Sequence, residues 1–330
     1  MEMYDKLGIT QRQMAELSGH SVTTINRELA ARKIEPLPSS SVRNKKTSAH
    51  DCRSVLYDLY AHKNPILKKI HVFYNFKGGV GKTSLCYQVS SHLALLGYKV
   101  LVIDSDPQAN LSSAYGLSQN MDLATLSDVL IKGVPIEAAK VQIFSGLDLI
   151  ASNLSMTRLE ADLDKLPRRE EQLLECLNAS KPYYDFILID ANPSINLINR
   201  NSITAADVLN IVCETQPFSL NGLSLVLEDL KDYFSKIKID FPKINIIPNK
   251  YEDRMTTSAE AMTVLRDHYG QFLKPDFAVR KSEDFNNSVK NGIPLAFFAK
   301  KNSIAWEDVL EVVHHIVDIS VEASKAEKVA

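Results

Sequence analysis

The feature that most constrains this chain is the run 77–84, which reads Lys-Gly-Gly-Val-Gly-Lys-Thr-Ser. An apolar stretch precedes the run, and a helical repeat follows it, with Leu85, Val89 and Leu93 four residues apart. A strand that leads through a glycine-rich turn into a helix N-terminus binds phosphate, because backbone N–H groups and the helix dipole face the anion. The predicted nucleotide-binding residues of the loop are Lys77, Gly78, Gly79, Val80, Gly81, Lys82, Thr83 and Ser84.

Two of the loop residues have roles that follow from the pattern. Lys82 would reach the β- and γ-phosphates, and the Thr83 hydroxyl would bind Mg²⁺. The ordinary phosphate-loop pattern has a glycine five residues before Gly81, where this chain has Phe76. An additional lysine, Lys77, follows it, and this substitution distinguishes the loop from the ordinary pattern.

Three aspartates come at the ends of two further apolar strands, expected at 98–103 and 187–189. Ligands of open α/β sheets bind at the carboxyl edge, so these aspartates should lie beside the phosphate loop. Carboxylates, waters and substrate phosphates are what Mg²⁺ prefers. A strand-terminal Asp can also simply cap a turn, but three together favour the metal. The predicted metal-binding residues are Thr83, Asp104 and Asp190.

Apolar strands alternate with longer helical stretches from residue 70 onward, which predicts an α/β fold with a doubly wound, mostly parallel sheet. The length of 330 residues suits one large domain and a smaller one. We predict a small N-terminal all-α domain with a linker at 1–66 and a P-loop ATPase domain at 67–330.

The segment 11–29 has the layout of a helix-turn-helix. Gly19 supplies the turn, Ser21 can cap the second helix, and Val22, Ile25 and Leu29 form its expected buried stripe. A small helical hairpin used for dimer contacts is the alternative. The side chains expected to face DNA are Thr23, Thr24, Asn26 and Arg27.

Charge is distributed unevenly along the chain. The net charge is −2, but residues 1–70 carry twelve Lys/Arg against seven Asp/Glu, so the rest is acidic. A basic appendage is typical of DNA binding, although a solvated surface is the common alternative. The Pro- and Ser-rich segment 34–50 reads as a flexible linker or a wing, and 54–62 as a short helix.

The loop is the deviant Walker A box, and the chain resembles ParA-type partition ATPases of the ParA/MinD superfamily. The resemblance spans residues 68–318 and rests on several segments in family order, which are 101–108, 185–194, 206–207, 216–220, 249–254 and 279–283. It implies an ATPase that hydrolyses ATP to ADP and phosphate, uses Mg²⁺ and forms a homodimer.

The resemblance also implies residue roles. Lys77 would touch the partner's phosphate across the dimer, and Asp106 would orient the attacking water. The catalytic set is then Lys77, Lys82 and Asp106. Asn249 and Tyr251 fall where relatives contact adenine, with a buried Asn that satisfies a loop backbone as the alternative.

Family members bind nonspecific DNA as ATP dimers through basic residues of the C-terminal third. Each such residue could equally be a plain surface charge. The candidates here are Arg254, Arg266, Arg280, Lys281 and Lys290. The resemblance further implies a centromere-binding partner of the ParB type that stimulates weak hydrolysis, and an N-terminal domain that represses the operon.

The chain has no apolar run near the ~20 residues that a membrane span needs. The last helix, at 306–321, carries acidic rather than basic residues on its polar face, which indicates packing and not membrane targeting. Those acidic residues are Glu307, Asp308, Glu311 and Asp318. Four widely spaced cysteines fit a reducing compartment, so we expect a cytoplasmic, nucleoid-associated protein.

Two other functions remain open at this point. One keeps the ATPase but positions another cellular cargo. The other is a DNA-binding transcriptional regulator whose nucleotide site only switches conformation. The presence of Lys82 and Asp106 favours turnover over a mere switch.

Overall fold

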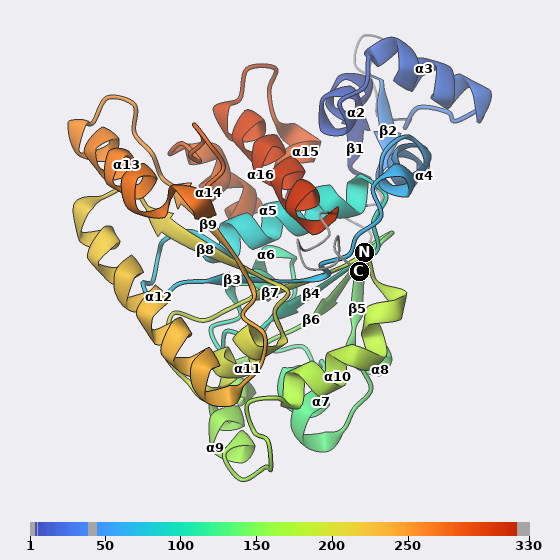
Figure 1. The fold of residues 1–330 in the computed structure, drawn as a ribbon. Coiled ribbons are helices and arrows are strands. Elements are labelled where there is room, and N and C mark those ends of the chain that lie inside the picture. The colour runs from blue at the N-terminus through green and yellow to red at the C-terminus, as the bar shows by residue number, and fades with distance from the viewer. Residues whose placement is uncertain (1–3, 5, 39–44, 322–330) are drawn as a thin grey trace, which may run out of the picture.

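The computed structural model describes residues 4, 6–38 and 45–321, with the backbone alone at 217–221. Its centre is a seven-stranded sheet in the order β5-β6-β4-β7-β3-β8-β9 (Figure 1). The strands are β3 Ile70–Tyr74, β4 Val100–Asp104, β5 Val141–Phe144, β6 Leu147–Ile150, β7 Phe186–Asp190, β8 Val208–Glu214 and β9 Lys243–Asn249. All neighbours pair in parallel except β5 with β6. The predicted mostly parallel α/β sheet is therefore confirmed.

The central strands consist of apolar residues because helices cover both faces of the sheet. Along β4, Val100 and Val102 join one buried cluster, whereas Leu101 and Ile103 join the other. This alternation divides the core into two layers. Helices α5 and α14–α16 lie on one face and α7–α12 on the other, while α13 lies near the β9 edge of the sheet, beside α14 (Figure 1).

The helices of the two layers connect the strands along the chain. Their bounds are α5 Lys82–Leu95, α6 Asn110–Ala114, α7 Leu126–Lys132, α8 Ile136–Ala139, α9 Leu159–Leu163, α10 Gln172–Ser180, α11 Leu197–Ala205, α12 Pro217–Ile237, α13 Thr256–Tyr269, α14 Glu283–Asn291, α15 Leu295–Phe298 and α16 Ile304–Val321. None of the helices within the described ranges is long and apolar enough to cross a membrane. Helix α16 packs its apolar stripe into the core, as its sequence predicts.

The N-terminal elements contain the two expected helices, and we call the described residues 6–38 and 45–63 the N-terminal unit. Its elements are β1 Gly8–Thr10, α2 Gln11–Ser18, α3 Val22–Ala31, β2 Lys46–Ser48, α4 Ala49–Leu59 and the 3-10 turn Ala61–Lys63. Gly19 ends α2 in the left-handed region at φ 69°, and the Ser21 hydroxyl accepts a hydrogen bond from the Thr24 amide. Both local predictions are confirmed.

Two details of the N-terminal unit differ from expectation. Val22 is 41% exposed, because it occupies the first position of α3 and the buried stripe begins one turn later at Ile25. Helix α4 starts at Ala49 rather than at residue 54, because Ser48 caps it by accepting a hydrogen bond from the Asp51 amide.

The segment expected to be a linker or wing is partly a strand. Strand β2 pairs antiparallel with β1, so that Ile9 lies opposite Thr47. Residues 39–44 of this segment lie outside the described residues. The prediction of an all-α N-terminal domain is therefore wrong, because a short antiparallel ribbon of β1 and β2 joins the helices there.

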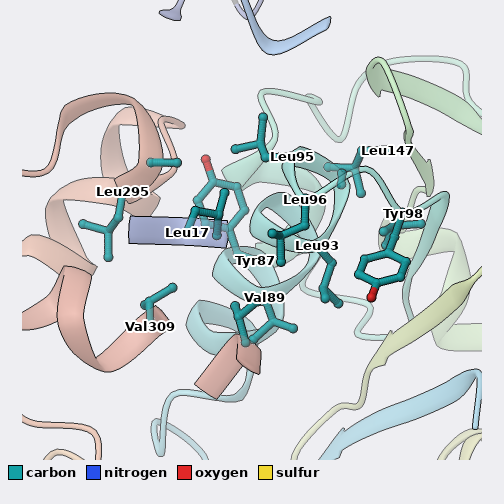
Figure 2. Close-up of a cluster of buried hydrophobic side chains, with 14 of the residues drawn as sticks. Leu17, Tyr87, Val89, Leu93, Leu95, Leu96, Tyr98, Leu147, Leu295 and Val309 are labelled. Carbon is teal, nitrogen blue, oxygen red and sulfur yellow. The ribbon is translucent and has the colours of Figure 1, made fainter. Parts of the chain in front are cut away.

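The N-terminal unit shares its core with the layer that contains α5 and α16. Figure 2 shows Leu17 of α2 near Tyr87 of α5 and near Leu96, which follows α5, with Leu295 and Val309 from the C-terminal helices nearby. Polar contacts join the same elements. The Trp306 indole donates to Glu16 Oε2 at 2.8 Å, the His314 Nε2 to the Leu17 carbonyl at 2.8 Å, and the Gln13 amide to the Ala299 carbonyl at 3.3 Å. The division into domains at 66/67 stays a prediction.

Candidate phosphate-binding site

The phosphate loop lies between β3 and α5, at the carboxyl edge of the sheet. Gly79 and Gly81 have φ angles of 76° and 99°, which belong to the left-handed region. A Cβ on Gly81 would lie 2.3 Å from Nδ2 of Asn249, which donates a hydrogen bond to the Val80 carbonyl at 2.7 Å. Glycine is thus required at position 81 both by its backbone and by the close approach of Asn249.

Lys82 is the first residue of α5 and is buried, with 6% of its surface exposed. Its ammonium group donates a hydrogen bond to the Lys77 carbonyl at 3.2 Å. Burial lowers the pKa of Lys82, and the negative charges of Asp190 and Asp106 partly offset that effect. The side chain is held where an anion in the loop would meet it.

Asp190 ends β7 and is 1% exposed. Its Oδ1 has no hydrogen-bond partner among the described residues. Burial, followed by the nearby charge of Asp104, raises the pKa of Asp190 well above its ordinary value, against the effects of the Thr83 hydroxyl and of Lys82. A buried carboxylate oxygen without a partner normally has a ligand to satisfy it, and a cation is the suitable one.

Asp104 ends β4 and is fully buried, but it is not free of partners. Its Oδ2 accepts hydrogen bonds from the Ser112 amide and hydroxyl at 2.8 and 2.7 Å, and its Oδ1 from the Asp106 amide at 3.1 Å. Burial raises the pKa of Asp104 to about 6, although these hydrogen bonds oppose the shift. Asp104 therefore holds Asp106 and α6 in place, and its part in binding the metal stays a prediction.

A cavity of about 490 Å³ opens over the loop. Its wall includes Lys82, Thr83, Asp106, Pro193 and Lys290. Asp106 is held there from both sides, since its carboxylate accepts a hydrogen bond from the Gln108 amide and its carbonyl one from the Ser152 hydroxyl. The structure brings five of the eight predicted loop residues and Asp106 to one cavity, and these five are Gly79, Gly81, Lys82, Thr83 and Ser84.

The residues beside this cavity fit Mg²⁺ with a phosphate ligand. Within the described ranges, no three His, Cys, Asp or Glu side chains form a cluster that could hold a metal by themselves. Mg²⁺ characteristically takes one or two protein oxygens and completes its shell with waters and phosphates. The Thr83 hydroxyl and the unpartnered Asp190 Oδ1 are such oxygens.

A smaller cavity of about 170 Å³ adjoins the loop at Gly81 and Ser84. Asn249 lines it, as expected for a base contact, but the side chain is also bonded to backbone at both ends. Its amide donates to Val80, and its Oδ1 accepts from the Lys250 amide at 2.9 Å. Tyr251 instead lines a separate cavity of about 960 Å³ between α13 and α16. Tyr251 lines neither of the two cavities at the loop, and its contact with adenine stays a prediction.

Lys77 lies at the rim of the loop with 47% of its side chain exposed. Its amide donates to Asn75 Oδ1 at 3.0 Å, and its ammonium group forms an ion pair of 2.5 Å with Glu214, the last residue of β8. Lys250 binds the same carboxylate at 2.9 Å. Sequence inspection identified neither Glu214 nor Lys250, although Lys250 adjoins the predicted Asn249.

The basic residues of the C-terminal third differ in their partners. The guanidinium group of Arg280 donates to Asp308 at 3.0 and 2.6 Å, and Asp308 is only 3% exposed. The expectation that Asp308 lies on a polar outer face is therefore wrong, because it is the buried counter-ion of Arg280. Lys281 pairs with Glu252 at 3.1 Å and Arg266 with Asp276 at 3.3 Å.

The other two candidates have different surroundings. Arg254 is exposed, and Lys290 lines the cavity over the loop. Of the helix α3 residues, Thr23, Asn26 and Arg27 are exposed, whereas Thr24 is half-buried and hydrogen-bonded to Ser21. A DNA contact by any of these residues stays a prediction.

Residues 68–243 match the model of the AAA domain family. The chain is 31% identical over 254 residues to the cell division protein PomZ of Myxococcus xanthus, which covers 77% of this chain and 79% of that protein. It is 31% identical over 211 residues to the chromosome partitioning protein ParA of Caulobacter vibrioides, which covers 63% of this chain and 78% of that one.

The fold is also similar to a solved structure. An ATP complex of McdA from Cyanothece superimposes with a TM-score of 0.69 at 24% identity, and the match covers 78% of this chain and 99% of that one. At this identity the likeness supports the fold. The sheet and loop described above are thus a known arrangement.

Proposed function

Because the chain belongs to the AAA domain family and is an ATPase of the ParA type, we propose that it segregates plasmid or chromosomal DNA. ATP binding forms a homodimer, and the dimer binds DNA nonspecifically. A centromere-binding partner of the ParB type then stimulates the weak ATP hydrolysis, and hydrolysis releases the dimer from DNA. The N-terminal unit binds operator DNA and represses the partition operon.

The cofactors are ATP and Mg²⁺, and the residues of the loop have distinct tasks. Thr83 and Asp190 would hold the metal, which supplies neutralisation of the phosphate charge when bound. Lys82 adds a fixed positive charge beside the β- and γ-phosphates, while Asp106 accepts a hydrogen bond from the attacking water. Phosphoryl transfer needs mainly positioning and charge neutralisation, so such groups are sufficient.

One observation carries the ATPase part of the proposal. Lys82, Thr83 and Asp106 line the same cavity, and a buried carboxylate without a partner at Oδ1, that of Asp190, lies close enough to bond Thr83. Burying this oxygen without a hydrogen-bond partner costs about 1–3 kcal/mol of stability. A loop with a purely structural role would gain nothing in return for that cost.

Phosphate release by the full chain with Mg²⁺ and DNA tests the assignment of Asp106. Asp106→Asn should still bind ATP and dimerise but should release phosphate at a rate reduced at least ~100-fold. Lys82→Ala should lose ATP binding itself. Turnover by Asp106→Asn at the wild-type rate would show that this carboxylate does not orient the water. A wild-type chain that binds ATP without releasing phosphate would instead indicate the nucleotide-switched regulator.

Lys77 is proposed to couple ATP to dimerisation by reaching the partner's phosphate. Its position at the rim of the loop and its half-exposed side chain support this role. A cation supplied from another subunit can contribute ~10³–10⁵ in rate. Light scattering of Lys77→Ala with ATP should show monomers where the wild type forms dimers, and equal dimerisation would contradict the coupling.

DNA binding by the ATP dimer is proposed to involve exposed basic residues of the C-terminal third. Arg254 and Lys281 are exposed and therefore better candidates than Arg280, whose guanidinium group Asp308 holds. Contacts to phosphate weaken steeply with salt. Binding measured by fluorescence anisotropy should require ATP rather than ADP and should fall with salt. Equal binding with ADP would contradict it.

Operator binding is proposed for the exposed face of α3. Thr23, Asn26 and Arg27 are on that face, and the α2–turn–α3 geometry suits a recognition helix. Thr24 contributes indirectly, because its hydrogen bonds with Ser21 hold the first turn of α3. Arg27→Ala should reduce protection of the promoter in a footprinting assay without changing ATP binding.

A second candidate function is the positioning of another cellular cargo. The similarity to PomZ, a cell division protein, favours it. Loss of the gene should then leave plasmid and chromosome inheritance intact and displace a large cellular complex. Loss of inheritance would support partition instead.

A further inference from the structure

A single carboxylate at the rim of the phosphate loop binds two lysines. Glu214 Oε2 lies 2.5 Å from the Lys77 ammonium group, and Glu214 Oε1 lies 2.9 Å from that of Lys250. The Glu214 side chain is 13% exposed, whereas the side chains of Lys77 and Lys250 are 47% and 42% exposed, so water shielding is confined to the carboxylate end of the two pairs. Burial alone would raise the pKa of Glu214, but the two lysines together lower it.

The two lysines come from different segments of the chain and bind different oxygens of this carboxylate. Lys77 belongs to the loop itself, whereas Lys250 follows β9 and also donates to the Gly79 carbonyl at 2.5 Å. Lys250 lines the smaller cavity together with Gly81. The Lys250 ammonium group therefore stands next to the backbone that would surround a polyphosphate, and the shared Glu214 carboxylate holds the Lys77 ammonium group close to it.

A polyphosphate in this loop would meet the lysines and Glu214 at the same time. The lysines attract it, whereas the carboxylate repels it and already occupies donors that would otherwise face the phosphates. Without a nucleotide, Glu214 has the opposite effect, because it neutralises two like charges brought close together. The same carboxylate thus stabilises the loop without nucleotide and opposes the binding of a polyphosphate.

We propose that Glu214 is an internal counter-ion that competes with the phosphates of ATP for Lys77 and Lys250. Its release of the two lysines accompanies nucleotide binding and makes them available, Lys77 for the partner subunit. This inference rests on the proposed function, since it requires that the loop binds ATP. Glu214 is then a positioning residue with two effects. It lowers the affinity of the loop for nucleotide, and it keeps Lys77 paired within its own subunit until ATP binds.

Nucleotide titration of the full chain tests the proposal. The affinity for Mg·ATP is measured calorimetrically for the wild type, Glu214→Gln and Glu214→Asp, with Glu137→Gln as the control. Glu137 is also paired with a lysine, Lys140, at 2.7 Å, but it belongs to α8 and lines neither cavity at the loop. Glu214→Gln should bind ATP about 3- to 10-fold more tightly, and Glu137→Gln should match the wild type.

The aspartate variant separates direct contact from general charge. Asp retains the negative charge but is one methylene shorter, so it cannot pair with both lysines from the same backbone position. Glu214→Asp should therefore also bind ATP more tightly than the wild type. Tightening in Glu214→Gln alone would indicate a general charge effect and would overturn the proposal, as would unchanged or weaker binding by Glu214→Gln. A wild-type chain that binds no ATP would instead refute the proposed function.

Discussion

Replacing Gly81 by alanine tests how the loop is built. The alanine would have to adopt φ near 99°, a left-handed conformation that costs an L-residue about 1–2 kcal/mol. Its Cβ would also lie 2.3 Å from Asn249 Nδ2, so the amide would have to leave the Val80 carbonyl. Loss of that hydrogen bond and of a satisfied buried donor adds about 1–2 kcal/mol. We expect Gly81→Ala to lower the free energy of unfolding by about 3 kcal/mol.

Urea denaturation of five proteins measures this effect: the wild type, Gly81→Ala, Gly79→Ala, Asn249→Ala and the double mutant Gly81→Ala/Asn249→Ala. The control is Gly79→Ala, because Gly79 is also left-handed at φ 76° but has no atom within 4 Å of its missing Cβ. It should cost only the conformational part, about 1–2 kcal/mol. In an Asn249→Ala background the clash is absent, so Gly81→Ala should cost no more than Gly79→Ala. Equal costs of Gly81→Ala in both backgrounds would refute the argument, since a double-mutant cycle isolates the contact.

Three further predictions concern stability. Burial lowers the pKa of His92 to about 4, so the folded state keeps the imidazole neutral, whereas the unfolded chain binds a proton near pH 6.5. The contribution of His92 to the free energy of unfolding is therefore complete above pH 6.5 and is lost as the pH falls toward 4. Between pH 7.5 and 5.0 the wild type should lose about 2 kcal/mol that His92→Gln does not lose, and identical pH profiles in urea would contradict this. Arg280→Met should cost about 3 kcal/mol, because it leaves the buried Asp308 carboxylate without its cation, and a loss near zero in urea denaturation would show that water replaces the guanidinium. Leu17→Ala should cost about 3 kcal/mol in the same single transition seen by fluorescence of Trp306, the one tryptophan of the chain, and a separate early transition would show that the N-terminal unit does not share the main core.

The parts of the fold that could be predicted from the sequence are those determined by neighbours along the chain. The run 77–84 and its flanking strand and helix lie where the sequence indicates, because glycine content and apolar period are local properties. The carboxyl-edge placement of Asp104 and Asp190 follows from parallel strand order. Gly19 and Ser21 were predictable for the same reason, since a turn and a cap need only a few consecutive residues.

The parts that could not be predicted depend on partners far away in the sequence. The pair between Lys77 and Glu214 spans 137 residues, and only the β3–β8 pairing brings the two together. Asp308 occupied a polar position in the helical pattern, yet it is buried against Arg280, which lies 28 residues earlier, before α14. Val22 fitted the apolar period of α3, but the buried face of this helix begins only at Ile25, so Val22 is exposed. The apolar period of a sequence shows which face of a helix a residue occupies, but it does not show which part of the protein covers that face.

The packing of the N-terminal unit against the C-terminal helices also determines the order in which the protein can be completed during synthesis. The Leu17 carbonyl meets His314, a separation of 297 residues, and the Tyr4 hydroxyl meets the Gly292 carbonyl across 288. A ribosome that adds roughly 5–20 residues per second needs about 15–60 s to cover that distance. During this interval the apolar faces of α2 and α5 have no cover from α15 and α16. The nascent chain therefore keeps part of its apolar surface uncovered until its last helix emerges.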